Sequence, residues 1–418
     1  MTAETLTFIH SGDVHLGAPF RGLRALSKSW SDRLLRAIPE AWSRVVDACI
    51  DNQVDFLLLA GDIFDNDQPS YAHYRCFIEG LERLSDHGIA VYMCAGNHDP
   101  YATWQRMPVA LPDNARLFAS DAPEFAVHCR DGKPLALIGC RGFTPLAADG
   151  TIADGITRAA AERACGQCAP FAVGMLHSGL WMDPYKAPVK EEVLRAAGMD
   201  YWALGHIHMR YVDNADDPKI AYCGCIQGRD IRETGERGCL KVTLRPDAPA
   251  QVETIPTASV EWQRIHVDVS KAGSLGEIRN LCVKAMFGAT ESTCEEMVAR
   301  ITLIGPTEMH AKLEQPAVLE DLRIELNESY PDSLFCDALV NGTSAPIDKD
   351  ALAHQGMFQA AFLDVSRNAL SEAEIRIARL RESAARKKVN LPENMEDAYP
   401  ELVERAEDLV LGLLGGEA

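Results

Sequence analysis

Hydrophobic and polar residues alternate in blocks along the first 258 residues, where short apolar runs are separated by longer amphipathic stretches. Short apolar runs bounded by polar turns are typical of buried β-strands, and the stretches between them are long enough for helices. Apolar residues at helical spacing predict helices over 31–52 and 71–87, and an alanine-rich segment predicts another over 145–166. This order is typical of a layered α/β domain. The predicted strands are 6–10, 56–60, 91–94, 135–139, 171–176 and 201–204.

The pattern changes after a proline-containing stretch at 244–256. Strand-like and helix-like segments then follow in the order β-α-β-α-β, which predicts a small α+β module. Two further amphipathic helices are predicted over 371–388 and 399–414. We therefore expect three parts, namely a first domain over 1–258, the α+β module over 259–341, and a linker with C-terminal helices over 342–418. The predicted elements of the module are 262–269, 275–287, 298–304, 318–326 and 334–340.

The charge balance limits how the chain can hold nucleic acid. Of the 418 residues, 41 are Lys or Arg and 61 are Asp or Glu, so the formal net charge is −20. A whole-chain electrostatic attraction to nucleic acid is therefore not expected, and any contact must come from a local basic patch, bound cations or a partner. The composition, 47% hydrophobic and 24% charged, is otherwise that of an ordinary globular protein.

The chain is expected to be cytoplasmic. Its N-terminus lacks the basic and apolar segments of a signal peptide, and no apolar run approaches the ~18 residues that span a bilayer, so no membrane contact is expected. The 13 cysteines are scattered, which is typical of reduced thiols. Cys165 and Cys168 have half of a zinc-site spacing, but with Cys223, Cys225 and Cys239 they fit no standard zinc ribbon.

Five short motifs directly follow five of the predicted strands. In an open α/β sheet ligands collect at the carboxyl ends of the strands, so these motifs are expected to bring their side chains to one edge. Residues i and i+2 of an extended chain point to the same side, so Asp13 can face one site with His15, as His206 can with His208. The motifs are Asp13-Val14-His15, Gly61-Asp62-Ile63-Phe64-Asp65, Gly96-Asn97-His98-Asp99, His177-Ser178-Gly179 and Gly205-His206-Ile207-His208.

These motifs offer oxygen and nitrogen donors without cysteine. Mixed imidazole and carboxylate suits manganese, iron or zinc at an open position better than a closed structural zinc. Seven donors exceed the need of one ion but fit two divalent ions that share a carboxylate, and such a pair ~3.5–4 Å apart can bind phosphate and activate a bridging water. The expected ligands are Asp13, His15 and His208 for one ion, Asn97, His177 and His206 for the other, and Asp62 as the bridge.

Each motif taken alone also fits a structural role. A single histidine after a strand is usually a hydrogen-bonded structural residue, and Gly-Asn-His-Asp has the composition of a turn. Five such motifs, each at a strand end and each with metal-binding side chains, are hard to obtain by chance. The set therefore favours a metal site.

In order and spacing the five motifs resemble the calcineurin-like metallophosphoesterase superfamily. The opening motif, residues 8–17, is similar to its DNA-repair exonuclease branch, and Ile226-Gln227-Gly228-Arg229-Asp230-Ile231-Arg232-Glu233-Thr234-Gly235 is similar to the YhaO-type group within that SbcD-like branch. The resemblance implies a four-layer β-sandwich flanked by helices, a capping module, and C-terminal helices that dock an SMC-like ABC ATPase. It also implies manganese, cleavage of phosphodiesters in DNA, and a homodimer.

The resemblance assigns a catalytic role to His98, at the position the family uses to contact the scissile phosphate and assist the leaving alkoxide. His98 neighbours Asn97 but is not needed as a ligand, so as an imidazolium it could donate a proton. Asp99 either orients that imidazole or caps the loop. One position departs from the family pattern, because repair nucleases tend to carry a second histidine where this chain has Asp65.

Arg229 and Arg232 are candidates for binding substrate phosphates, although they could equally pair with acidic residues of their own segment. The chain has no nucleotide-binding P-loop sequence, so any ATP dependence would come from the partner. We interpret the chain as a dinuclear metal-dependent phosphodiesterase, a DNA exonuclease or endonuclease in DNA repair. Two alternatives are a phosphoesterase on nucleotides or other small diesters, and a DNA-end-binding ATPase-partner subunit with weak catalysis.

Overall fold

The computed structural model describes residues 4–20, 28–144, 150–289, 294, 296–330, 333–346 and 357–387, together with 395, 398–400, 402–403, 406–407 and 410–411. The chain divides into two compact units. The first contains 1–265, 286–300 and 329–337, and the second contains 266–285, 301–328 and 338–418.

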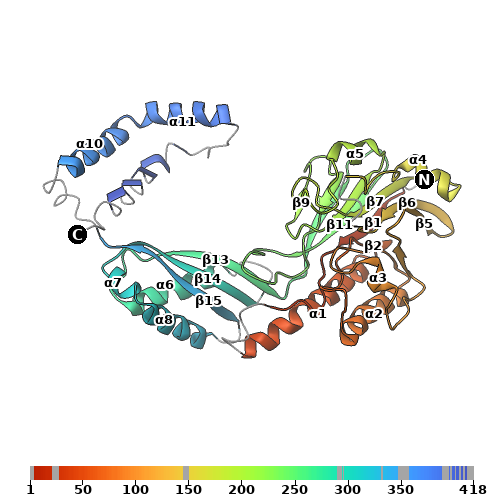
Figure 1. Cartoon of the computed structure of the whole chain (residues 1–418), viewed down its shortest axis with the longest axis horizontal. Coiled ribbons are helices and arrows are strands. Elements are labelled where there is room, and N and C mark those ends of the chain that lie inside the picture. The colour runs from red at the N-terminus through yellow and green to blue at the C-terminus, as the bar shows by residue number, and fades with distance from the viewer. Residues whose placement is uncertain are drawn as a thin grey trace. The chain divides into compact units, whose positions relative to one another are not determined.

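Two six-stranded sheets form the first unit (Figure 1). In the first sheet β1 to β4 are parallel neighbours, and β11 and β12 extend it antiparallel beyond β1. In order, its strands are β12 (Gln251–Pro256), β11 (Gly238–Leu244), β1 (Leu6–Ser11), β2 (Phe56–Leu59), β3 (Ala90–Cys94) and β4 (Ala115–Phe118).

The second sheet has a parallel centre as well, because β6, β7, β8 and β10 are parallel neighbours. In order, its strands are β5 (Glu124–Arg130), β6 (Lys133–Arg141), β7 (Phe171–His177), β8 (Tyr201–Gly205), β10 (Ile220–Tyr222) and β9 (Tyr211–Val212).

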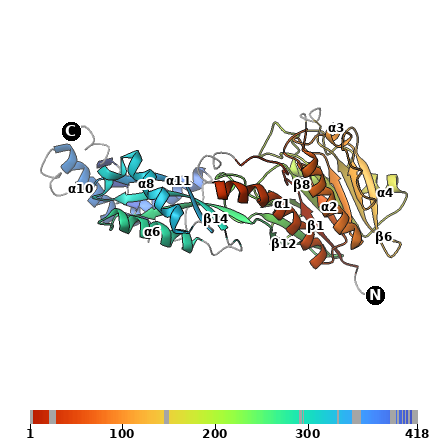
Figure 2. The same ribbon diagram turned by 90° about the horizontal axis from the view of Figure 1, so that it is seen from below.

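Side-chain alternation along the strands builds four layers. Phe8 and Leu58 of the first sheet pack with Ile138 and Val173 of the second, so the two sheets share a core. The neighbouring residue Ile9 points the opposite way, into a core shared with two helices. These are α1 (Lys28–Asp51) and α2 (Tyr71–Asp86), which Figure 2 shows side by side along the sheets.

Two short helices cover the outer face of the second sheet. Ala161 of α4 (Arg158–Cys165) and Leu194 of α5 (Glu191–Ala196) are buried in a third core with Leu137 and Trp202 of that sheet. Helix α3 (Tyr101–Trp104) follows the Gly96–Asp99 motif. The predicted fold class, a helix-flanked β-sandwich of mixed α/β type, is confirmed.

The second part of the chain has the predicted β-α-β-α-β order. Strands β13 (Val260–Asp268), β14 (Glu296–Pro306) and β15 (Leu334–Ser344) form one sheet in that order. Helices α6 (Leu275–Gly288), α7 (His310–Leu313) and α8 (Pro316–Ser329) lie between these strands in the sequence, and α10 (Met357–Ser371) and α11 (Ala373–Lys387) follow. The domain boundaries at 258 and 341 stay a prediction.

Three predictions from periodicity were wrong or incomplete. The helix expected over 145–166 is limited to α4, because Gly150 and Gly155 adopt positive φ and Thr157 caps the helix by accepting a hydrogen bond from Ala160 N; residues 145–149 lie outside the described residues. Helix α10 occupies part of the expected linker. Strands β4, β5 and β9 to β12 were not predicted. The last predicted helix, 399–414, falls partly outside the described residues and stays a prediction.

The described cysteines are all free thiols, and no cysteine joins a described metal-binding cluster. Among the described residues, no helix is both long and apolar enough to cross a membrane.

Candidate metal centre

The loops that follow β1, β2, β3, β7 and β8 meet at one end of the sandwich. Asp13 N donates to Gly61 O at 3.0 Å, which joins the loops after β1 and β2. His98 N donates to Asp62 Oδ1 at 2.8 Å and brings in the loop after β3. His206 N donates to the Asp13 carboxylate at 3.0 Å and brings in the second sheet. Both sheets therefore contribute side chains to one site.

The backbone at these loops is turned rather than extended. Asp13, His15 and Asp62 have φ values of 47°, 53° and 52°, in the left-handed region that L residues rarely adopt. The expectation that Asp13 and His15 share a side because the chain is extended was therefore wrong in its reasoning, although the structure does bring both to the site. The turn arises because His15 N donates to Asp62 O, while Val14 is buried in the core. Such strained backbone is found most often at functional sites.

Gly96 is required by the close approach of two loops. A Cβ added at this position would lie 2.1 Å from Asp62 Oδ1 and 2.3 Å from Asp62 N, far inside van der Waals contact. Only glycine lets the loop after β3 pass this close to Asp62.

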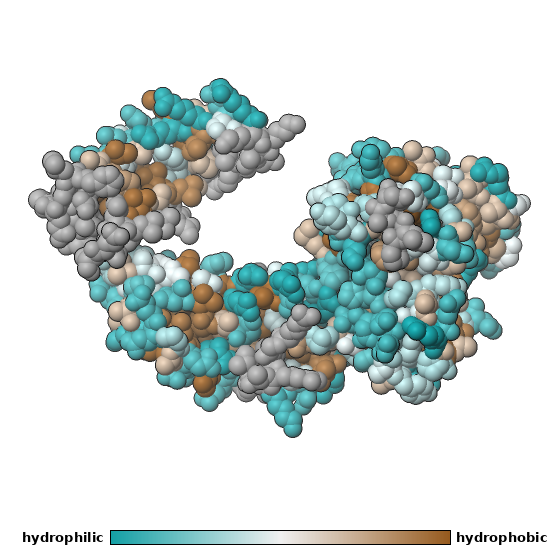
Figure 3. Space-filling view, in the orientation of Figure 1, coloured by the Kyte–Doolittle hydropathy of each residue, from teal (hydrophilic) through white to brown (hydrophobic). Residues whose placement is uncertain are grey.

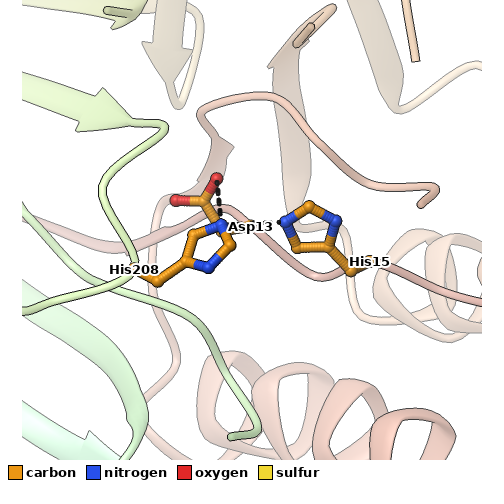
Figure 4. Close-up of side chains that lie close together, drawn as sticks. All are labelled: Asp13, His15 and His208. Carbon is orange, nitrogen blue, oxygen red and sulfur yellow. Dashed lines mark hydrogen bonds and ion pairs between the residues drawn. The ribbon is translucent and has the colours of Figure 1, made fainter. Parts of the chain in front are cut away.

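Asp13, His15 and His208 form a first set of donor atoms (Figure 4), which all lie within 4.8 Å of one another. His15 Nε2 lies 3.1 Å from His208 Nε2, which in turn lies 3.9 Å from Asp13 Oδ1. Asp13 and His15 are fully buried, whereas His208 is partly exposed. The set is thus open to solvent on the side of His208.

Asp62, His177 and His206 form a second set within the same distance limit. His177 Nε2 lies 3.4 Å from Asp62 Oδ2 and 3.1 Å from Asn97 Oδ1. The same Asp62 Oδ2 lies 3.8 Å from Nε2 of His15, which belongs to the first set. Asp62 therefore stands between the two sets.

The donor atoms fit a cation. His177 Nδ1 donates a hydrogen bond to Ala60 O at 2.8 Å. The other ring nitrogen, Nε2, therefore faces the two oxygen atoms Asp62 Oδ2 and Asn97 Oδ1. Burial alone would lower the pKa of His177, but Asp62 and Asp13 raise it to about 10. Burial would likewise raise the pKa of Asp62, yet the neighbouring His177 and His15 hold it well below its usual range. The site favours positive charge beside a buried carboxylate, which is the environment of a divalent metal ion with nitrogen and oxygen ligands.

Three carboxylates surround the histidines, and sequence reasoning did not identify their roles. Glu233 Oε1 lies 2.7 Å from His208 Nδ1, Asp183 Oδ2 lies 3.0 Å from His206 Nε2, and Asp65 Oδ1 lies 3.2 Å from His15 Nδ1. Carboxylates in this position orient metal-binding imidazoles and raise their basicity. Nothing in the local sequence of Asp183 signals this contact, because His206 lies on a different strand end.

The two candidate substrate-binding arginines both form ion pairs within their own segment. Arg229 Nη2 lies 2.8 Å from Glu233 Oε1 and 2.8 Å from His208 Nδ1, and Nη1 lies 3.2 Å from Asp65 Oδ1. Arg232 Nη2 lies 2.6 Å from Asp230 Oδ2, and its side chain is 77% exposed. Arg229 thus links two of the orienting carboxylates, and contact of either arginine with substrate stays a prediction.

His98 and Asp99 make different hydrogen bonds, and these favour different roles for the two side chains. His98 Nδ1 donates to Asp65 O at 2.7 Å, and its partly exposed ring lies 4.9 Å from the ring of His15. The buried Asp99 carboxylate instead accepts hydrogen bonds from Gly96 N and Ile63 N, both at 2.8 Å. Of the two roles considered for Asp99, this geometry favours holding the loops together. Burial, with Asp62 nearby, raises the pKa of Asp99 to about 8.

Most of the chain matches known protein families. Residues 6–210 match the family model of calcineurin-like phosphoesterases, and residues 262–344 match the middle domain of metallophosphoesterase YhaO. An uncharacterized metallophosphoesterase YhaO from Bacillus subtilis is 33% identical over 304 residues, which cover 72% of each chain.

More distant relatives and a solved structure also match. The DNA double-strand break repair protein Mre11 from Aeropyrum pernix is 24% identical over 312 residues, 69% of this chain and 70% of its own. A solved structure of a dimetal phosphatase from Danio rerio matches 60% of this chain and 98% of its own at 10% identity, with a TM-score of 0.34.

Proposed function

Because the chain belongs to the calcineurin-like metallophosphoesterase family, in its DNA-repair exonuclease-like branch, and is therefore a hydrolase of phosphoester bonds, we propose that it cleaves phosphodiester bonds in DNA with two divalent metal ions. The observation that carries the proposal is the place of Asp62, whose Oδ2 lies within 4 Å of a histidine from each donor set. A shared carboxylate is what a two-ion site requires.

In this proposal Asp13, His15 and His208 hold one ion, Asn97, His177 and His206 hold the other, and Asp62 bridges them. Manganese is the metal that the family resemblance implies, and iron and zinc are alternatives because imidazole and carboxylate suit all three. When bound, such ions bind the phosphate, activate the attacking water and stabilise the leaving oxygen.

His98 is proposed to assist the leaving group. Its Nδ1 is committed to the carbonyl of Asp65, so Nε2 is the atom that can face substrate. Asp65 cannot take this role, because it is an anion: burial would raise its pKa, but His15 and Arg229 lower it. One histidine, rather than the usual pair of the repair nucleases, therefore serves the leaving oxygen here.

DNA cleavage is tested by incubating end-labelled single-stranded and double-stranded DNA with the protein and Mn²⁺, beside bis(p-nitrophenyl) phosphate. We expect cleavage of DNA that is lost in Asp62→Ala. Hydrolysis of the small diester without cleavage of any DNA would contradict the DNA assignment and favour the alternative of a small phosphodiester, which the net charge of −20 also suits.

Glu233 gives a prediction about metal binding. Burial would raise its pKa, but His208 and Arg229 hold it well below the usual range, so Glu233 is an anion beside the imidazole. In Glu233→Gln the basicity and orientation of His208 are lost, and Mn²⁺ affinity is expected to fall about 10–100-fold. Isothermal titration calorimetry measures this, with Glu236→Gln, a surface partner of Arg210, as the control. Equal Mn²⁺ affinity in wild type and Glu233→Gln would refute the orienting role.

We propose that the C-terminal helices dock a partner protein. The resemblance to the DNA-repair exonuclease branch implies that this partner is an SMC-like ATPase. Val365 of α10 and Ile375 and Leu380 of α11 are exposed large apolar residues. Figure 3 shows apolar residues among hydrophilic ones along these helices. Homodimer formation and a cytoplasmic location stay predictions. The free thiols described above are the state in which a reducing compartment keeps cysteines.

A further inference from the structure

The loop between β7 and α5, residues 178–189, is ordered by its own hydrogen bonds. Gly179 N donates to Lys186 O at 2.9 Å, and Ser178 Oγ donates to Ala187 O at 2.8 Å, so the two arms of the loop are tied together. Leu180 and Ala187 are buried and anchor it on the second sheet. The loop is therefore a fixed support for the side chains at its tip.

Two large aromatic side chains of this loop face solvent. Trp181 is 65% exposed and Tyr185 is 84% exposed. Trp181 is nevertheless held in place, because its Nε1 donates to Glu191 Oε1 at 3.2 Å and its ring lies against that of Tyr211 at 84°. Exposed aromatic surface on an ordered loop is unfavourable in water and marks a binding surface.

The loop that carries these aromatic residues reaches the second donor set through Asp183. Asp183, two residues from both Trp181 and Tyr185, reaches His206 Nε2 at 3.0 Å. Two residues of chain span at most about 7 Å, so both aromatic residues start close to the second donor set. A ligand that places a phosphate at the centre would bring its neighbouring groups within reach of the loop that carries both rings.

We propose that Trp181 and Tyr185 form a stacking platform for unpaired nucleobases next to the scissile phosphate, so that the enzyme takes single-stranded or frayed DNA. This inference rests on the proposed function. Every base has a π-face that aromatic side chains can stack on, and stacking needs no positive field. It therefore adds affinity that does not depend on positive charge, of which a chain with a net charge of −20 has little to spare. In an intact duplex the bases are paired and stacked on one another, and unstacking them costs energy.

The test replaces Trp181 by leucine, which keeps apolar bulk, and by phenylalanine, which keeps a ring. Binding of a short fluorescein-labelled oligothymidylate is followed by anisotropy in chelator, and kcat/KM for its cleavage is measured with Mn²⁺. In Trp181→Leu both affinity and kcat/KM are expected to fall about tenfold, and Trp181→Phe should recover most of the loss. The loss should be equal at low and at physiological salt, because no phosphate contact is removed.

An abasic oligonucleotide of the same length and charge isolates the base. Wild type should bind the abasic oligonucleotide more weakly than the oligothymidylate. Trp181→Leu should bind the abasic oligonucleotide with the same affinity as wild type. Tyr71→Leu, which removes a side chain 62% exposed on α2, is the matched control for loss of an exposed ring. Equal losses on both oligonucleotides, or wild-type affinity in Trp181→Leu, would overturn the platform, and the latter is the result expected if the loop serves a protein partner. Failure of wild type to cleave any DNA would instead overturn the proposed function.

Discussion

Asp62→Ala is expected to bind neither metal ion tightly and to reduce hydrolysis of every phosphodiester to the level of a protein-free blank. Asp62 Oδ2 lies 3.4 Å from His177 Nε2 and 3.8 Å from His15 Nε2, so one substitution removes an oxygen from both donor sets. Its other oxygen, Oδ1, accepts a hydrogen bond from His98 N at 2.8 Å. The variant therefore also loosens the loop that carries Asn97 and His98.

Metal content per chain, measured by inductively coupled plasma mass spectrometry after dialysis against Mn²⁺, is the direct readout. Asp62→Asn keeps the shape and the hydrogen bond to His98 N while removing the charge, which separates loss of a ligand from loss of the loop. Asp67→Ala, an exposed carboxylate of the same loop, should retain metal and activity. Two ions in Asp62→Ala would refute the bridging assignment.

His98→Ala is expected to retain both ions and to lower kcat about 10²–10⁴-fold, the range for a general acid. His98 belongs to neither proposed ligand set, although one of its ring nitrogens lies within 4.8 Å of donor atoms of His15 and Asp62. Its hydrogen bond to the Asp65 carbonyl leaves Nε2 available. Asp65, whose carbonyl accepts the hydrogen bond from His98, is ionised and cannot replace the lost proton donor.

The variant is assayed with bis(p-nitrophenyl) phosphate and with DNA after its metal content has been matched to wild type. A substrate with a better leaving group should suffer a smaller loss, because its leaving oxygen needs less protonation, and a merely structural role would not produce this difference. Unchanged kcat on DNA would show that His98 acts only as part of the loop.

The interior of the sandwich was predictable from the sequence because its strands are continuous apolar runs. β2 and β8, for example, are buried along their whole length, and such runs are read directly. The peripheral strand β12 was missed because its residues are mostly half-buried and it follows prolines in the preceding turn. The turn structure at 150–155 was missed because alanine content suggests a helix whereas Gly150 and Gly155 decide the backbone.

At the site, the convergence of the seven proposed ligands was predictable because each follows a strand end. Their backbone was not, because the left-handed turn at Asp13 depends on Gly61, a residue of another loop. Asp183 and Glu233 were missed for a related reason. Each contacts a histidine through a loop whose path is set by the fold, so sequence spacing carries no signal for them.

The centre draws its donors from both sheets, and this has a consequence for the folded state. Asp13, His15 and Asp62 come from loops of the first sheet, whereas His177, His206 and His208 come from the second. An ion held by donors of both sheets would act as a reversible cross-link across the sandwich, and each bound ion would stabilise the folded chain by about 2.7 kcal/mol when present at 100 times its dissociation constant. Removal of the metal is therefore expected to lower the free energy of unfolding together with the catalytic activity.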